Sequence, residues 1–441
     1  MTELTATLTT LALAELHGSL ADPALESMNF LNEVAGRYPE ALSLAAGRPY
    51  EEFFDLADIQ RYLNRYERYL TEDRGLSAAQ VRRAFFQYGR TKGIIHELVA
   101  RNLSVDEGIS VDPESIVVTV GCQEAMFLVL RALRRDERDV VLAVAPTYVG
   151  LTGAAKLVDM PVLTVAGGPG GVDLADLTAT VHQARAQGLR PRACYLLADH
   201  SNPSGLSLDL PTRHALLELA EREDLLLLED NPYGVFASSP EDRPPTLKAL
   251  DTRHRVVYLS SYAKTGLPGA RVGFVVADQL VANGSDGGSD ATPSLLADEL
   301  AKLKSMLTVN TAPIAQAVIA GKLLTYDGSL VKANEREIAL YRENLARLLS
   351  GLAQAFPADS GVEWNTPSGG FFLVVSVPFE VDDALLETSA RDYGLLWTPM
   401  HHFTQDPQAR RQLRLAVSLL TPEQVDEGLR RLTRLIADRL G

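Results

Sequence analysis

A lysine in an unusual setting lies within SSYAKTGLPGARVGF, residues 260–274. Lys264 follows a run rich in β-formers, precedes a glycine-proline turn and stands seven positions before Arg271. A lysine amine becomes a nucleophile towards aldehydes once its pKa falls, as it does when the amine is buried or lies near another cation. The stretch therefore predicts a lysine that forms a covalent bond with an aldehyde.

The lysine-bound aldehyde cofactor of amino-acid chemistry is pyridoxal phosphate, whose ring makes demands that other residues can meet. A carboxylate must hold the pyridine nitrogen, and Asp230 ends LLLLED, a run apolar enough for a central, buried strand. A buried carboxylate without a cation would protonate or destabilise the fold, so pairing with the ring nitrogen is expected. Tyr233 and Asn202 are candidates to hydrogen-bond the ring oxygen, although Asn202 before a proline is also typical of a plain turn. Tyr148, in APTYVG, either stacks on the ring or is simply a half-buried tyrosine.

Three features could bind the cofactor phosphate. The segment VTVGCQEAMFLVL places Gly121, Cys122 and Gln123 where a strand turns into a helix, so backbone N–H groups and the helix dipole favour an anion there. Ser261 stands at the end of the run before the lysine. Arg271 offers a bidentate guanidinium, although a single arginine in such a segment is more often a solvated surface residue.

The chain that carries these residues alternates β-rich runs with amphipathic helical stretches. This alternation predicts an α/β fold with a mostly parallel, seven-stranded sheet and helices on both faces. Ligands of such sheets gather at the carboxyl ends of the strands, which is where the candidate residues stand. The expected strands are 115–120, 139–144, 160–165, 193–198, 224–229, 255–260 and 272–277.

The pattern changes near residue 330, where a smaller α+β domain is expected to begin. One long charged amphipathic helix is predicted over 329–356, and short strands are predicted within 369–377, 394–400 and 413–418. The Gly-, Ser- and Asp-rich segment 282–294 predicts a flexible surface insertion. We therefore expect an N-terminal arm and pocket-closing segment, a large cofactor-binding domain and a small C-terminal domain, over residues 1–55, 56–330 and 331–441.

Composition narrows the function classes. The 441-residue chain is 46% hydrophobic, enough for two cooperating domains with sizeable cores. Its net charge of -15 would repel a phosphate backbone, so no nucleic-acid partner is expected. The longest apolar runs have the length of strands, so no membrane association is expected. The two cysteines are far apart, which fits a reducing compartment and predicts a cytoplasmic protein.

In order along the chain, GCQEAM, PTYVG, SNPSG, EDNPYG and SSYAKTGLPGARVGF resemble the motifs of fold-type I, pyridoxal phosphate-dependent aminotransferases of class I/II. The resemblance covers nearly the whole chain. The motif sequences are most similar to those of the branch of 2-aminoadipate and kynurenine aminotransferases, which also includes the effector domains of MocR-type regulators. It implies that Lys264 binds the cofactor and then carries a proton between the substrate α-carbon and the cofactor. It also implies the ring and phosphate roles expected above for the other motif residues.

The resemblance assigns three further residues. Arg414, in LRLAVS, matches the arginine that binds the substrate α-carboxylate, although a strand arginine can also face solvent. Tyr88, in FFQYGRTKG, matches a tyrosine that reaches the phosphate in the partner subunit, which implies a homodimer. Arg48, in AAGRP, lies in a segment similar to one that closes over the substrate. It would meet a substrate carboxylate or phenol there, or else pair with Glu51 or Glu52.

The chain departs from the family pattern around the pocket. Cys122 replaces the usual hydroxyl residue and is a weaker donor, so backbone donors must contribute more. After Tyr88 the chain reads GRTKGIIHELVA, where the family usually has GPTEGYPPLRE. Near the C-terminal active-site loop it reads TPMHHF, residues 398–403, where a proline-glycine pair is expected. His401 and His402 are adjacent and cannot easily direct both rings at one ion, and no third ligand is spaced for one. No metal is therefore expected.

These residues predict an aminotransferase that exchanges an amino group between an α-amino acid and a 2-oxo acid in two half-reactions. The N-terminal segment 28–54 resembles that of aminotransferases of bacterial secondary metabolism, including those that make 4-hydroxyphenylglycine. This resemblance implies that the amino acid could be aromatic or non-proteinogenic. One alternative is another reaction at the α-carbon, because the same cofactor supports decarboxylation, elimination, oxidation and cyclisation. The other is a non-catalytic regulator that binds the cofactor. That reading lacks a DNA-binding region, since about 30 residues precede NFLNEV and carry no recognition helix.

Overall fold

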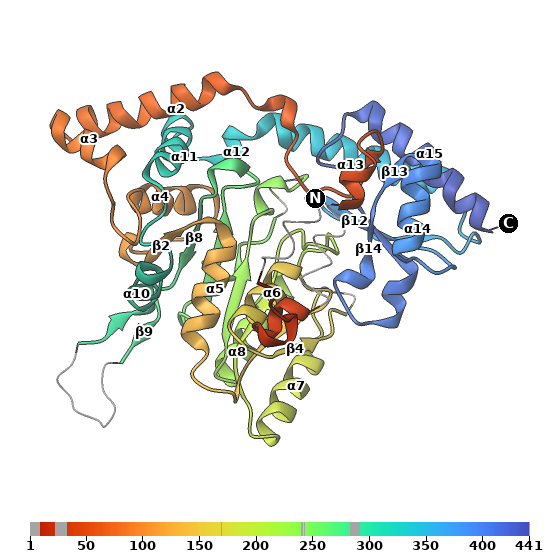
Figure 1. Ribbon diagram of the computed structural model, residues 1–441, viewed down its shortest axis with the longest axis horizontal. Helices are drawn as coiled ribbons and strands as arrows, with labels where there is room; N and C mark the ends of the chain where they lie inside the picture. The colour runs from red at the N-terminus through yellow and green to blue at the C-terminus, as the bar shows by residue number, and fades with distance from the viewer. Residues whose placement is uncertain are drawn as a thin grey trace.

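The computed structural model describes residues 9–22, 33–168, 170–239, 241, 243–282 and 292–440. Most of the expected insertion at 282–294 lies outside these ranges. A seven-stranded sheet forms the centre of the larger part of the molecule (Figure 1). Its strands are β2 (Ile116–Thr119), β3 (Asp139–Val144), β4 (Val162–Val165), β5 (Arg190–Leu196), β6 (Leu226–Asp230), β7 (Val256–Ser261) and β8 (Gly273–Val276).

The sheet confirms the fold class expected from the sequence. Its strand order is β2-β8-β7-β6-β5-β3-β4, and only β8 runs antiparallel to its neighbours. Each of the seven predicted runs contributes one strand. Residues of β3 alternate between two cores, because successive side chains of a strand point to opposite faces. Val141 and Ala143 belong to one core, and Leu142 and Val144 belong to the other.

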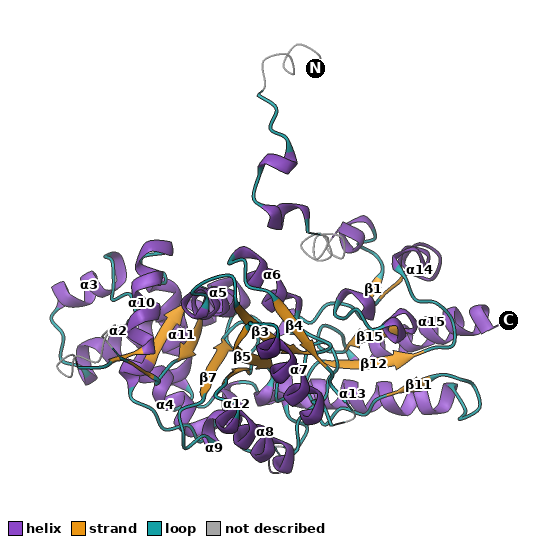
Figure 2. Ribbon diagram, turned by 90° about the horizontal axis from the view of Figure 1, so that it is seen from below, coloured by secondary structure: helices purple, strands orange, loops and turns teal. Residues whose placement is uncertain are grey.

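Helices cover both faces of this sheet (Figure 2). On one face lie α5 (Gly121–Leu133) and α6 (Val149–Leu157), and on the other lie α8 (Leu210–Arg222) and α9 (Leu247–Leu250). The remaining helices of this part are α2 (Leu56–Arg68), α3 (Ala78–Phe86), α4 (His96–Asp106), α7 (Leu174–Ala186), α10 (Leu296–Leu307) and α11 (Pro313–Thr325). Two short strands, β9 (Leu280–Val281) and β10 (Ser294–Leu295), pair with each other.

A smaller unit lies at one end of the molecule, where Figure 1 shows α13, α14 and α15 beside β12. Its four-stranded sheet has the order β11-β12-β15-β14. The strands are β11 (Glu363–Trp364), β12 (Phe372–Ser376), β14 (Thr398–Pro399) and β15 (Gln412–Ala416). The helices are α12 (Leu330–Ala333), α13 (Glu335–Ala355), α14 (Asp383–Thr388) and α15 (Pro422–Leu440).

The prediction of one continuous helix over 329–356 is wrong. Helices α12 and α13 are separated at Asn334, whose backbone leaves the helical region at φ -124° and ψ 24°. The Asn334 amide donates to the Thr265 carbonyl at 2.9 Å and to the Leu330 carbonyl at 2.7 Å. These hydrogen bonds tie the break to the segment that follows Lys264.

An N-terminal stretch joins the smaller unit. Strand β1 (Leu42–Ser43) pairs in parallel with β13 (Leu395–Leu396). The predicted strand within 394–400 is therefore divided between two sheets, because β13 pairs with β1 and β14 pairs with β15. The residues after β1 continue over the carboxyl edge of the large sheet, where their backbone contacts Lys264 and Arg414.

The topology explains why distant motifs meet. Strands β2, β3, β5, β6 and β7 run in the same direction, so their carboxyl ends lie at one edge of the sheet. The expected site residues follow these ends, and Arg271 precedes the start of antiparallel β8 at the same edge. Within the described ranges, every helix is too short or too polar to traverse a lipid bilayer.

Candidate active site

A cavity of about 460 Å³ opens at the carboxyl edge of the large sheet. The N-terminal segment, the strand ends and the smaller unit all contribute to its wall. The structure thus brings together most of the residues expected from the sequence. Those lining the cavity are Arg48, Cys122, Gln123, Tyr148, Asn202, Asp230, Tyr233, Ser261, Lys264, Arg271 and Arg414.

Asp230 is a buried carboxylate at the end of β6, with 2% of its surface exposed. The Tyr195 hydroxyl donates to its Oδ2 at 2.7 Å, and the Cys122 thiol donates to its Oδ1 at 3.5 Å. Burial raises the pKa of Asp230 to about 6, against the opposing effect of these two hydrogen bonds. In the described part of the chain it forms no ion pair with a basic side chain. A cation entering the cavity beside it would therefore be stabilised strongly.

Lys264 lies in the loop between β7 and β8, and its Nζ donates to the Gly47 carbonyl at 2.6 Å. Burial, followed by the nearby cations Arg414, Arg48 and Arg271, lowers the pKa of Lys264 to about 8. The unprotonated amine, which is the nucleophile towards an aldehyde, is therefore a minor form at pH 7 but far more abundant than in an ordinary lysine. The amine also lies 5.9 Å from the centre of the Tyr233 ring.

At the start of α5, two glycines allow Arg271 and a neighbouring strand to approach the backbone closely. Gly121 has a φ of 72°, and a Cβ there would lie 2.6 Å from a guanidinium nitrogen of Arg271. A Cβ on Gly273 would lie 2.7 Å from the backbone nitrogen of Cys122. The two glycines therefore let the arginine approach the free N–H groups of the helix start, which is a favourable place for a phosphate. Ser261 contributes a hydroxyl that already accepts from the Ala263 N–H at 3.1 Å.

Arg414 projects from β15 into the opposite side of the cavity and is 7% exposed. It donates to the Asn202 Oδ1 at 2.7 Å, to the Ala45 carbonyl at 2.7 Å and to the Thr398 hydroxyl at 3.1 Å. Its Nε is buried without a hydrogen-bond partner. Burial lowers the pKa of Arg414 to about 10, so the guanidinium remains charged at neutral pH. A carboxylate would satisfy this desolvated cation.

The ring-facing residues are connected to this arginine. The Asn202 amide donates to the Tyr233 hydroxyl at 3.5 Å while its oxygen accepts from Arg414. Burial raises the pKa of Tyr233, so its hydroxyl keeps its proton. Burial also raises the pKa of Tyr148 to about 12. Asn202 therefore joins the region around Lys264 to the region around Arg414.

Two of the site residues expected from the sequence have exposed side chains. Tyr88 is 82% exposed and does not line the cavity. Arg48 is also exposed but reaches the cavity wall, and no ion pair with Glu51 or Glu52 forms, although all three residues are described. The alternative that Arg48 is neutralised by these neighbours is therefore wrong for the chain in this structure.

The sequence reasoning missed several neighbours of the charged groups. Tyr195, which holds Asp230, lies inside a predicted strand, where nothing distinguishes its hydroxyl from that of an ordinary core tyrosine. The Phe372 and Phe403 rings lie 4.4 Å and 5.0 Å from the Arg414 guanidinium carbon. Their roles depend on how the smaller unit packs on the large sheet, for which the sequence contains no local signal.

The expectation about the adjacent histidines is corrected by the structure. His401 and His402 follow β14 in a short helical turn, η11 (Met400–His402). Their rings lie side by side with centroids 4.3 Å apart, and both approach Asp383. A third potential ligand is therefore present, supplied by α14 from 18 and 19 positions earlier in the chain.

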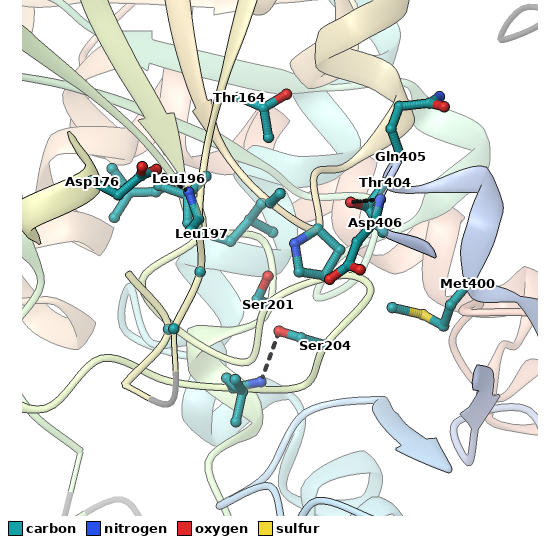
Figure 3. Close-up of a pocket in the computed structure, with 18 of the residues that line it drawn as sticks. Thr164, Asp176, Leu196, Leu197, Ser201, Ser204, Met400, Thr404, Gln405 and Asp406 are labelled. Atoms are coloured by element: carbon teal, nitrogen blue, oxygen red, sulfur yellow. Dashed lines mark hydrogen bonds between the residues drawn. The ribbon is translucent and has the colours of Figure 1, made fainter. Parts of the chain in front are cut away.

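A second cavity, of about 590 Å³, lies beside the first, and Leu197 lines both. Figure 3 shows Ser201, Ser204, Thr404 and Asp406 around it, with Met400 at its edge. Its described lining residues include no lysine, arginine or histidine. The groups that could bind a phosphate or activate an aldehyde thus belong to the smaller cavity.

The smaller cavity fits a phosphorylated pyridine aldehyde. It combines a lysine with a lowered pKa, a buried carboxylate without a cation and a corner of glycine, helix start and arginine. When bound, pyridoxal phosphate withdraws electrons from the α-carbon of an amino acid attached to it. The residues that would hold it are Lys264, Asp230, Tyr233, Asn202, Tyr148, Ser261, Arg271 and the start of α5.

Comparison with known proteins agrees with this chemistry. The family model "Aminotransferase class I and II" matches residues 66–432. A (S)-3,5-dihydroxyphenylglycine transaminase of Amycolatopsis orientalis is 58% identical over 98% of this chain and 96% of its own length. A 2-aminoadipate transaminase of Thermus thermophilus is 29% identical, with 90% of each protein covered. The kynurenine aminotransferase of Pyrococcus horikoshii, solved in complex with PMP, superposes with a TM-score of 0.78 at 26% identity, covering 100% of this chain and 99% of that one.

The family match spans most of the chain, and the first of these relatives is similar over nearly its full length. The sheet order, the cavity and the charged groups inside it agree with that match. The chain belongs to the aminotransferase class I and II family and is a pyridoxal phosphate-dependent aminotransferase of fold type I.

Proposed function

We propose that the amino donor or product of this enzyme is an arylglycine, in which an aromatic ring is attached directly to the α-carbon, and that a 2-oxo acid is its partner. The 58% identity to a transaminase named for (S)-3,5-dihydroxyphenylglycine carries this proposal. The cavity wall is compatible with a hydroxylated ring. It combines apolar Met126, Val149 and Phe403 with the polar side chains of Ser43 and Arg48.

We assign the chemical roles from the arrangement of these groups. Lys264 would hold the cofactor covalently, and its amine would move the proton at the substrate α-carbon. Asp230 keeps the ring nitrogen protonated, and Tyr233 with Asn202 donates to the ring oxygen. Arg414 binds the substrate carboxylate, which supports a common orientation for amino donor and acceptor.

The phosphate roles complete the assignment. Arg271 and Ser261 bind the phosphate together with the N–H groups of Gly121, Cys122 and Gln123. The thiol of Cys122 donates its hydrogen bond to Asp230 and therefore does not donate to the phosphate. Tyr148 stacks on the ring.

The proposed assembly is a homodimer in which Tyr88 reaches the phosphate of the partner. An exposed apolar region supports it: Phe86 is 77% exposed, Tyr88 82% and Met306 86%. The loop containing Gly89 lies next to Asn310, and the Thr308 hydroxyl donates to Glu124 in the first turn of α5. These contacts connect the chain next to Tyr88, through the residues after α10, to the start of α5. Large exposed apolar regions are typical of protein interfaces. A cytoplasmic location stays a prediction from composition.

The reaction is tested by mixing the purified, cofactor-loaded enzyme with a panel of amino acids. Conversion of the cofactor absorbance to that of the amine form, reversed by 2-oxo acids, is expected for transamination. Release of carbon dioxide or ammonia, or uptake of oxygen, without that conversion would instead indicate another α-carbon reaction. Ligand binding without turnover would indicate a regulator. Lys264→Ala should abolish the lysine-bound absorbance.

Substrate class is tested separately within the same panel. Hydroxylated phenylglycines should have a kcat/KM at least roughly tenfold above that of tyrosine and phenylalanine, whose rings are one methylene further from the α-carbon. Comparison of (S)-3,5-dihydroxyphenylglycine with unsubstituted phenylglycine measures the contribution of the hydroxyls. Equal values for tyrosine and the arylglycines would contradict the substrate proposal and leave the transamination result intact.

A further inference from the structure

We propose that Asp383, His401 and His402 form a binding site for a divalent transition-metal ion, with Zn²⁺ as the preferred ion. The site lies on the smaller unit, outside the cofactor cavity, and does not depend on the proposed substrate. Two imidazoles and a carboxylate are ligands that Zn²⁺ accepts, and three protein ligands leave a fourth position for water.

The positions of the ligand atoms support this proposal. The Asp383 Oδ1 lies 2.9 Å from the His402 Nε2 and 3.4 Å from the His401 Nε2, and the three ligand atoms lie within 4.8 Å of one another. In a tetrahedral site with bonds of about 2.0–2.2 Å, two ligand atoms lie roughly 3.3–3.6 Å apart. The side chains therefore need only small movements to surround an ion.

The two imidazoles of this cluster depend on one carboxylate oxygen. Both imidazoles approach the same oxygen of Asp383, so they share one acceptor. An ion placed between the three groups would accept both Nε2 lone pairs and balance the carboxylate charge, which a shared hydrogen bond cannot do.

Burial and access are also suitable for a protein-held ion. The side chain of His402 is 7% exposed and that of His401 21% exposed, so the rings are held by packing. Asp383 is 44% exposed and leaves a path from solvent. The nearest basic side chain of the neighbouring turn, Arg410, lies 3.6 Å from Glu380, which offsets its charge.

An ion in this position would join α14 to a turn that borders the active site. Helix α14 supplies Asp383, and η11 supplies the two histidines. The residues on either side of η11 reach the cavity: the Thr398 hydroxyl accepts from Arg414, and the Phe403 carbonyl accepts from the Thr147 N–H at 3.0 Å. Coordination therefore fixes the loop that surrounds the substrate-binding arginine.

The test is a titration of untagged holoenzyme, treated with chelator and dialysed, with Co²⁺ and then with competing Zn²⁺. We expect one Co²⁺ per chain, with visible d–d absorption bands of a four-coordinate nitrogen and oxygen site at wavelengths beyond the cofactor bands. Zn²⁺ should displace these bands. The absence of stoichiometric binding, or bands with sulfur-to-metal charge transfer, would overturn the proposal, since the latter would indicate a cysteine instead.

Variants identify the ligands. His402→Asn and His401→Gln should each weaken binding by roughly a hundredfold, because each removes one of three ligands while keeping a polar side chain. His214→Ala is the matched control, since His214 is an exposed histidine on α8, outside the cluster, and should bind Co²⁺ as the wild type does. Far-UV circular dichroism and cofactor content verify that each variant is folded. Retention of wild-type affinity by a folded His402→Asn protein would overturn the proposal, as would equal loss in His214→Ala.

Discussion

At the scale of single residues, the chemistry of the cavity depends on two titratable groups whose pKa values are shifted by their surroundings. Asp230 is made unusually basic by burial, while Tyr195 and Cys122 oppose that effect. Lys264 is made unusually acidic by burial and by surrounding cations. One group thus has an affinity for a cation and the other is ready to attack an aldehyde, and both effects arise from the same desolvated space.

The lowered pKa of Lys264 predicts a pH-dependent reactivity in cofactor-free enzyme. Below about pH 8 the amine is mostly protonated, so its acylation rate should rise about tenfold per pH unit and level off above pH 8. Quantitative mass spectrometry of the peptide that contains Lys264 measures this rate. In Arg414→Gln, loss of the cation that lowers this pKa most should move the midpoint to higher pH. A wild-type midpoint near the ordinary lysine value would show that the amine is not desolvated.

The hydrogen bond from Tyr195 predicts a loss of activity in Tyr195→Phe. Hydrogen bonds to charged groups contribute ~1.5–3 kcal/mol, so we expect kcat to fall by about tenfold to a hundredfold and the pKa of Asp230 to rise further. The comparison variant is Cys122→Ala, which should have a smaller effect because the thiol is a weaker donor at 3.5 Å. Steady-state kinetics with a 2-oxo acid in excess measure both. A kcat for Tyr195→Phe within twofold of the wild type would contradict this role.

Sequence patterns identified residues whose chemistry is local. Asp230 and Lys264 stand at strand ends, so their positions at one edge of the sheet could be expected from the alternation of elements. Tyr195 and the third residue of the histidine cluster could not, because each acquires its neighbour through pairing between segments far apart in the chain. Hydrogen bonds between distant segments leave no periodic pattern in the sequence.

At the scale of elements, the large sheet was the most predictable part, because its apolar runs are long and bounded by turns. The break between α12 and α13 was not predictable from hydrophobic periodicity, which continues through Asn334. The break arises from a tertiary contact, the hydrogen bond of that amide to Thr265. A side chain that satisfies a distant carbonyl can thus overrule a helical pattern.

Packing between α2 and α11 predicts the effect of a single added methyl group. A Cβ at Gly321 would lie 1.9 Å from the Tyr62 carbonyl oxygen, and backbone atoms cannot move aside cheaply. We expect Gly321→Ala to lower the free energy of unfolding by about 1–3 kcal/mol or more. Urea denaturation of the holoenzyme measures this change. The control is Gly36→Ala, where a Cβ meets no atom within 4 Å. Equal stability of the two variants would show that the helices are not this close.

At the scale of the whole molecule, function is expected to depend on assembly into a dimer. The homodimer stays a prediction, because the structure contains a single chain. The domain boundaries at residues 55 and 330 also stay predictions. The exposed region around Phe86, Tyr88 and Met306 is the surface where a second copy is expected. An active site completed by the partner would make activity depend on protein concentration.

Mixed dimers test whether Tyr88 serves the partner's site. Tyr88→Phe and Lys264→Ala should each be impaired alone. After denaturation and refolding together, half of the dimers should be mixed, and each should contain one complete site, restoring roughly a quarter of wild-type activity. Sedimentation equilibrium verifies the dimer, and refolding each variant alone is the control. Activity of the mixture equal to the mean of the two variants would contradict a shared site.

The segment 45–48 covers the cavity, and its hydrogen bonds to Lys264 and Arg414 are formed by its backbone carbonyls. The oxygens of Ala45 and Gly47 accept from Arg414 and Lys264, and that of Arg48 accepts from Ser418 at 2.7 Å. Since every residue type has a backbone carbonyl, mutation at 45 and 48 can alter the shape of the cavity wall without removing these hydrogen bonds. Gly47 is restricted, because a Cβ there would collide with the Phe372 ring. Evolution can therefore retune this enzyme towards new substrates by small steps in a short stretch of chain, while the backbone contacts to Lys264 and Arg414 persist.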